Sequence, residues 1–214
     1  MADLPSNTMA EIARLEVLEA YRSLPDDAHL RDLAGVATQL CNAPISVVNL
    51  VGEDELWSIT AVGIEPIRIP KKNAFCDYTI RTDDELVIPD THQDERFVAH
   101  PLVTQPPNVR FYAAAPLIVQ GGFRIGTFCV VDGTPREPTA KLIENLRTLG
   151  HSASQYLEYQ VAQRSGLAPV AMLCAWCEKV QVADQAEWQT LPEYLREHAS
   201  LTHGMCPSCL EAQA

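Results

Sequence analysis

The sequence predicts an α+β domain, with an antiparallel sheet, helices packed on one face and the other face left for a pocket. Hydrophobic periodicity indicates the order helix, helix, hairpin, irregular crossover, hairpin, helix. The crossover, from 63 to about 110, is too long for a simple connection, and such segments often form the walls of a binding site. Four cysteines crowded near the end of the chain predict a second, small zinc-ribbon-like module.

The helices and strands of the domain follow from apolar spacing and turn residues. Leucines and isoleucines at helical spacing, with an aspartate cap for the second helix, predict helices over 9–23, from Asp26 or Asp27 to about Asn42, and over 139–163. Runs of β-branched residues predict two hairpins, with strands over 45–51, 56–62, 111–119 and 124–132. Gly121 and Gly122 form the turn of the second hairpin.

Prolines divide the crossover into short pieces. They break any long element there, although FCDYTI can form a short helix and ELVIPD a short strand.

Composition and charge exclude several classes of protein. A hydrophobic content of 47% suits a folded globular chain, and no apolar run reaches the length of a membrane span. The start, MADLPSNTMAEIARLE, lacks the pattern of a secretory signal. The net charge of -12 disfavours nucleic acid as a partner. We therefore expect a cytoplasmic protein that binds neither membranes nor nucleic acid.

Several segments together carry a family resemblance. PISVVNLVGEDELW, FCDYTI, LVIPDTHQDERF, HPLVTQPPNVRFYAAAPL and IGTFCVVD occur in an order that resembles a GAF domain of the bacterial signalling type, over about 16–160. MLCAWCEKVQ, LPEYLREH and THGMCPSCL resemble a cysteine-rich extension at the ends of bacterial sensor and response-regulator proteins.

The resemblance implies a GAF/PAS-like fold and a sensory or regulatory role. GAF domains bind a small-molecule ligand or a protein partner, and their ligands include cyclic nucleotides, bilins, haem, amino acids and small anions. Many form a homodimer through their terminal helices. The expected protein is therefore a signalling module that acts on a protein partner, with a GAF domain over 9–165 and a four-cysteine module over 170–214.

The candidate ligand-binding residues cluster around the crossover. Arginines beside aromatic rings can grip a small anion or a planar ring, and the candidates are Cys76, Asp90, Arg96, Phe97, Arg110 and Tyr112. The alternative is structural, with salt bridges and caps from Asp90, Asp94 and Arg96 anchoring the loop. Cys76 and Cys129 are either small buried hydrophobes or a redox or covalent-attachment site, whereas Cys41 belongs to the core.

The terminal cysteines carry the clearest metal motif. Two C-x-x-C turns can present four thiolates to one ion, which predicts a structural zinc site of Cys174, Cys177, Cys206 and Cys209. An iron–sulfur cluster and a metal-free thiol or disulfide pair remain alternatives. His203 can replace one thiolate.

The sequence carries no recognisable catalytic motif, so we expect a protein that is not an enzyme. The enzymatic alternative is a thiol-dependent free methionine sulfoxide reductase, for which Cys76 and Cys129 are the available thiols. A further alternative is an iron–sulfur or haem sensor of redox state or gas.

Overall fold

The computed structural model describes residues 9–25 and 27–164 and the backbone of four short strands at 171–174, 179–182, 188–190 and 201–204. The chain divides into two compact units, Met1–Leu157 and Glu158–Ala214, and each is described by itself. Within the described residues, no helix has both the length and the apolar character needed to span a membrane.

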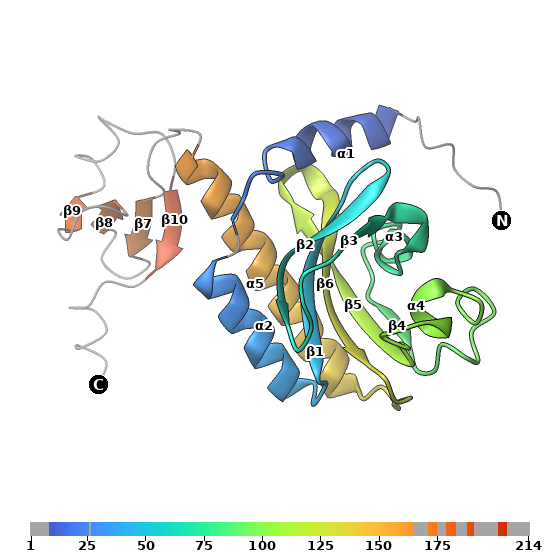
Figure 1. The fold of residues 1–214 in the computed structure, drawn as a ribbon. Coiled ribbons are helices and arrows are strands. Elements are labelled where there is room, and N and C mark those ends of the chain that lie inside the picture. The colour runs from blue at the N-terminus through green and yellow to red at the C-terminus, as the bar shows by residue number, and fades with distance from the viewer. Residues whose placement is uncertain are drawn as a thin grey trace. The chain divides into compact units, whose positions relative to one another are not determined.

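The first unit is built on a six-stranded antiparallel sheet (Figure 1). Its order is β3-β2-β1-β6-β5-β4. The strands are β1 (Ile45–Val51), β2 (Glu55–Val62), β3 (Arg68–Pro70), β4 (Leu86–Ile88), β5 (Phe111–Val119) and β6 (Phe123–Asp132). The central strands β1, β5 and β6 are almost continuously buried, because both faces of the sheet are covered. The predicted antiparallel α+β architecture is confirmed.

Two helices, α2 (Ala28–Leu40) and α5 (Ala140–Arg164), cover one face of the sheet (Figure 1). Asp27 caps α2 by accepting a hydrogen bond from the Leu30 amide at 3.0 Å. α5 approaches β5 so closely that a Cβ on Gly150 would lie 2.8 Å from the Cβ of Ala115. Glycine at this position therefore sets how closely the helix packs on the sheet.

The first helix, α1 (Met9–Glu19), is tied to the end of the sheet by a buried arginine. The Arg14 guanidinium donates to the Val51 carbonyl at 2.7 Å and pairs with Glu11 at 2.7 Å. Arg14 is buried although it is charged, because its long side chain reaches the backbone carbonyls of Val51 and Arg124.

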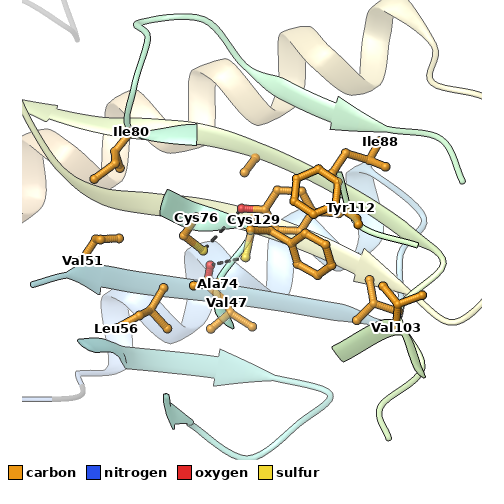
Figure 2. Packing of buried hydrophobic residues seen from close by; sticks show 14 residues of the cluster. Val47, Val51, Leu56, Ala74, Cys76, Ile80, Ile88, Val103, Tyr112 and Cys129 are labelled. Carbon is orange, nitrogen blue, oxygen red and sulfur yellow. Dashed lines mark hydrogen bonds between the residues drawn. The ribbon is translucent and has the colours of Figure 1, made fainter. Parts of the chain in front are cut away.

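The crossover covers the opposite face of the sheet. It contains η1 (Lys71–Asn73), α3 (Cys76–Thr79), β4 and α4 (Pro101–Thr104), so the short helix in FCDYTI and the short strand in ELVIPD are confirmed. The side chains of the crossover pack against the sheet as one hydrophobic cluster (Figure 2). The face that we expected to be left for a pocket is therefore occupied by the chain itself.

The second unit contains a four-stranded sheet in the order β10-β7-β8-β9. Its strands are β7 (Ala171–Cys174), β8 (Lys179–Val182), β9 (Trp188–Thr190) and β10 (Leu201–Gly204). β10 pairs with β7 in parallel, with Gly204 opposite Cys174. Cys177, Cys206 and Cys209 lie outside the described residues, so the zinc-ribbon-like module stays a prediction.

Candidate functional site

A polar cluster lies inside the hydrophobic layer between the crossover and the sheet. Asn49 on β1 pairs directly with Thr127 on β6, and Cys129 follows two residues later on the same face. Cys129 lies on β6 and Tyr112 lies on β5, and both belong to the cluster of buried residues that the crossover covers. Side chains of these three strands thus bring an amide, a hydroxyl, a phenol and a thiol together in the buried layer.

Cys76 supplies the fifth group, from α3 above the sheet. Figure 2 shows its sulfur beside that of Cys129, with the phenol of Tyr112 next to it. Both thiols are free and buried, with 5% of Cys76 and 2% of Cys129 exposed.

Three hydrogen bonds converge on the Cys76 sulfur. The Thr127 hydroxyl donates to it at 3.1 Å and the Tyr112 phenol at 3.4 Å. The Asn49 amide donates at 3.5 Å and also lies 3.6 Å from the Cys129 sulfur. A thiol is a weak acceptor, whereas a thiolate is a strong one, so this geometry favours the deprotonated form of Cys76.

The proton of Cys129 has two acceptors within reach. It donates to the Val47 carbonyl at 3.4 Å, and it also donates to Cys76 when that residue is a thiolate. This hydrogen bond is the largest cause that lowers the pKa of Cys76 to about 7, and Thr127, Tyr112 and Asn49 add to it while burial opposes it. The same hydrogen bond, with burial, raises the pKa of Cys129 well above its usual value.

A second layer of polar groups holds the donors in place. The Ser58 hydroxyl donates to the Asn49 side-chain oxygen at 2.9 Å and accepts from the Ile67 amide at 3.1 Å. Thr79 lies 3.2 Å from the Tyr112 phenol. Because the phenol donates to Cys76, Thr79 acts as the donor to the phenol. Burial, followed by the nearby charge of Cys76, raises the pKa of Tyr112 well above its usual value.

Aromatic rings enclose the other side of this cluster. Phe75 packs against Tyr112 and Phe97 at centroid distances of 5.0 and 4.8 Å and stacks on His100 at 4.6 Å. His100 Nδ1 accepts from the Leu102 amide at 3.2 Å, which places the ring proton on Nε2. That Nε2 is buried without a hydrogen-bond partner among the described residues, and burial lowers the pKa of His100.

The predicted ligand-binding residues fall into two groups. Cys76, Phe97 and Tyr112 come together in the buried layer. The other three are engaged in ion pairs, with Arg110 bonded to Asp90 through two contacts of 3.0 and 2.9 Å, and Arg96 bonded to Asp94 at 2.6 Å. An incoming anion would have to displace these carboxylates. Ligand binding by all six residues stays a prediction.

An open cleft of about 840 Å³ lies beside these ion pairs. Its charged residues are Asp90, Asp94, Glu95, Arg96, Arg136 and Glu137. Arg136 is bonded to Asp132 at the end of β6. Both arginines of the cleft therefore already have carboxylate partners.

Three members of the site were not predicted from the sequence: Asn49, Thr127 and Thr79. Asn49 stands in the middle of the apolar run ISVVNLV, where a buried amide needs a partner. That signal marks Asn49 as special but does not name its partners, which lie 27 and 80 residues away.

The predicted metal ligands are not described beyond the backbone of Cys174. Within the part of the chain that the structure describes, no group of three or more histidine, cysteine or acidic side chains is arranged to hold a metal ion.

Comparison with known proteins identifies the family. The GAF domain model matches residues 27–157. This range includes the whole six-stranded sheet, both sheet-covering helices through Leu157 and the polar cluster around Cys76. The chain belongs to the GAF domain family.

This GAF domain is similar to part of one curated protein. It is 30% identical, over 115 residues, to a cyclic di-GMP phosphodiesterase of Pseudomonas aeruginosa. The match covers 54% of this chain and 20% of that protein, so the chain spans about one fifth of its relative's length.

Solved structures show the same GAF fold. The GAF domain of an Acinetobacter phosphoenolpyruvate-protein phosphotransferase is 13% identical, with a TM-score of 0.53, and the match covers 75% of this chain and 98% of that one. A free methionine-R-sulfoxide reductase from Neisseria meningitidis is 17% identical, with a TM-score of 0.52 and coverage of 77% and 98%. At these identities the similarity establishes the fold alone.

Proposed function

We propose that this chain is a sensory GAF module that perceives a small molecule at the crossover face of its sheet and regulates a protein partner. One observation carries the proposal: polar groups from β1, β5 and β6 converge on a nucleophilic side chain in α3, inside a layer that is otherwise apolar. A face that served only as core would be more stable without buried polar groups. The cluster therefore has a use beyond packing.

The similarity to one fifth of a cyclic di-GMP phosphodiesterase supports a modular role. In that relative the matched segment is one part of a longer protein. We infer that this GAF domain likewise acts on an output activity, which another polypeptide or further sequence supplies.

The remaining parts of the proposal concern how the domain contacts its protein partner and a second copy of itself. α5 leads from the GAF sheet toward the cysteine-rich end of the chain, and we propose that this end docks the partner around a zinc ion held by Cys174, Cys177, Cys206 and Cys209. The two terminal helices of the domain, α1 and α5, are the surfaces for a homodimer. Zinc content near one ion per chain, lost in Cys177→Ser, would support the site, whereas iron would favour the iron–sulfur alternative.

Thermal unfolding with a panel of cyclic nucleotides, free amino acids and small anions tests the sensory role. A ligand at about 100 times its dissociation constant should stabilise the domain by about 2.7 kcal/mol. Tyr112→Phe should reduce that stabilisation, because it removes the phenol hydroxyl from the polar cluster around Cys76. Thr60→Val is the matched control, since Thr60 is fully buried in β2 but lies outside the cluster.

The proposal fails if crossover-face variants leave both ligand stabilisation and capture of the partner at wild-type levels. Loss of partner capture in Cys177→Ser alone would restrict the function to docking through the cysteine-rich end.

A second candidate function is reduction of free methionine sulfoxide. The observation that favours it is the contact between Cys76 and Cys129, since this chemistry needs a nucleophilic and a resolving thiol. Turnover with a thiol reductant, lost in Cys76→Ser, would establish it. Absence of turnover in the reduced wild-type protein would exclude it.

A further inference from the structure

Two buried cysteines of this domain differ sharply in their surroundings. Cys41, at the end of α2, is 4% exposed, and burial alone raises the pKa of its thiol. That is the behaviour of a small hydrophobic side chain in a core. Cys76 is buried to the same degree, yet side chains from three strands donate hydrogen bonds to its sulfur.

The donors to Cys76 form an anion cradle. Thr127, Tyr112 and Asn49 approach from the sheet, and Ser58 and Thr79 fix the last two of these in orientation. The titratable groups facing Cys76 are Tyr112 on β5 and Cys129 on β6, and both remain protonated donors while Cys76 is charged. A thiolate in this position has a second thiol as its immediate neighbour.

We propose that Cys76 is a hydroperoxide-reactive thiolate and that Cys129 resolves it by forming a disulfide. This inference rests on the proposed sensory role only where it takes the hydroperoxide to be the signal that the domain senses. The reaction itself can be measured without any partner.

The chemistry balances without a cofactor. The Cys76 thiolate attacks one oxygen of the hydroperoxide, the O–O bond breaks, and the sulfur becomes a sulfenic acid while the departing alkoxide or hydroxide takes up a proton. The Cys129 sulfur then attacks the Cys76 sulfur, the S–O bond breaks, and the leaving hydroxide takes the Cys129 proton as water. Two thiols are oxidised to one disulfide, and the hydroperoxide is reduced to an alcohol, or to water, plus water.

The position of Cys76 allows the reagent to reach it. α3 has four residues and belongs to the crossover, where short elements replace continuous strands. Such segments open locally at a lower free energy than global unfolding requires. A molecule as small as hydrogen peroxide needs only that local opening.

Differential alkylation after hydrogen peroxide treatment tests the proposal. Trypsin separates the three core cysteines into the peptides 32–68, 73–81 and 125–136, each of which contains one cysteine. We expect a disulfide-linked pair of 73–81 and 125–136, with the thiol in 32–68 still free. Cys41 is thus an internal control for nonspecific oxidation, and the four terminal cysteines fall in other peptides.

Four variants separate the roles of the two thiols from the role of the cradle. Cys129→Ser should leave Cys76 trapped as sulfenic acid, which dimedone labels, whereas Cys76→Ser should abolish oxidation of Cys129. Thr127→Val should slow the reaction at pH 7 severalfold, because it removes the closest donor to the thiolate, and Thr60→Val should not.

The proposal is overturned if Cys41 oxidises as fast as Cys76, or if both core thiols stay reduced under peroxide while the protein remains folded. Linkage with methionine sulfoxide but not with peroxide would also overturn it, in favour of the reductase. A peroxide-driven disulfide with unchanged partner capture would support this inference and count against the sensory role. Stabilisation by a ligand without oxidation of the thiols would support the sensory role and count against this inference.

Discussion

The two faces of the GAF sheet are both buried, yet they treat polar side chains differently. On the face covered by α2 and α5, Ser46 and Thr60 are fully buried, and their hydroxyls find no hydrogen-bond partner among the described residues. On the crossover face, Thr127 is equally buried, and its hydroxyl points at the Cys76 sulfur. A threonine hydroxyl thus has no partner among the described residues on one face, whereas on the other face it donates to a sulfur atom.

This contrast indicates where function lies in the domain. On the helix-covered face, a lone buried hydroxyl contributes packing at a cost of about 1 kcal/mol. On the crossover face, the side chains around the Cys76 sulfur satisfy one another in a network, and a satisfied network of this kind makes its site rigid. We therefore propose that the crossover face is the functional one, although its buried residues pack as a hydrophobic cluster.

The largest expected effect comes from breaking the helix-covered face. Leu146→Ala on α5 removes a fully buried side chain and should lower the free energy of unfolding by about 2–5 kcal/mol. The pKa of Cys76 should not change, because Leu146 lies on the other side of the sheet. Denaturant unfolding, with alkylation of Cys76 as a function of pH, measures both quantities, and a shifted pKa would show that the two faces are coupled.

Removing one donor from the crossover face should give the next largest effect. Thr127→Val should raise the pKa of Cys76 by about one unit, which corresponds to roughly 1.4 kcal/mol. Alkylation rates of peptide 73–81 between pH 5 and 10 follow this shift. If Thr60→Val raised the pKa equally, general packing rather than the cradle would control the thiolate.

The stability of the domain should depend on pH through Cys76. Its folded-state pKa, about 7, is below that of an unfolded cysteine, so its contribution is fully present above the unfolded value and is lost as pH falls through about 7. The free-energy difference between wild type and Cys76→Ser should therefore grow as pH rises from about 7 to about 8.5. A difference that is flat in pH would mean that Cys76 is protonated in the folded domain.

The smallest expected effect concerns Thr60. Thr60→Val replaces a buried, unpartnered hydroxyl with a methyl group of similar volume, and it should stabilise the domain by up to about 1 kcal/mol. A loss of stability in chemical denaturation would show that this hydroxyl has a partner, such as a bound water, and would weaken the contrast between the faces.

The order of elements was predictable from the sequence because it depends on local periodicity. Both hairpins, three helices and the short helix in FCDYTI follow from residue spacing and turn residues. β3 and α4 were not predicted, because prolines at 66, 70, 101 and 106 hide such short elements. The burial of Arg14 was not predicted, because its partners are strand carbonyls that helical periodicity does not reveal.

The site was only partly predictable, because its members come from four separate segments. Cys76 and Cys129 were recognised as possible redox residues, but they are 53 positions apart and only the fold brings them together. The structural alternative, in which Asp90, Asp94 and Arg96 anchor the loop by salt bridges, agrees with the ion pairs in the structure, but the sequence did not name Arg110 as the partner of Asp90. Charge pairing across a folded loop depends on geometry that spacing does not encode.

The most direct test of the central claim is the pH dependence of alkylation of Cys76 in the native wild-type domain, with Cys41 measured in the same sample. The cradle predicts a midpoint near pH 7 for Cys76 and a midpoint above that of an ordinary thiol for Cys41. Equal midpoints at or above pH 8.5 for the two residues would contradict the account. Cys76 would then be a packed hydrophobic side chain like Cys41.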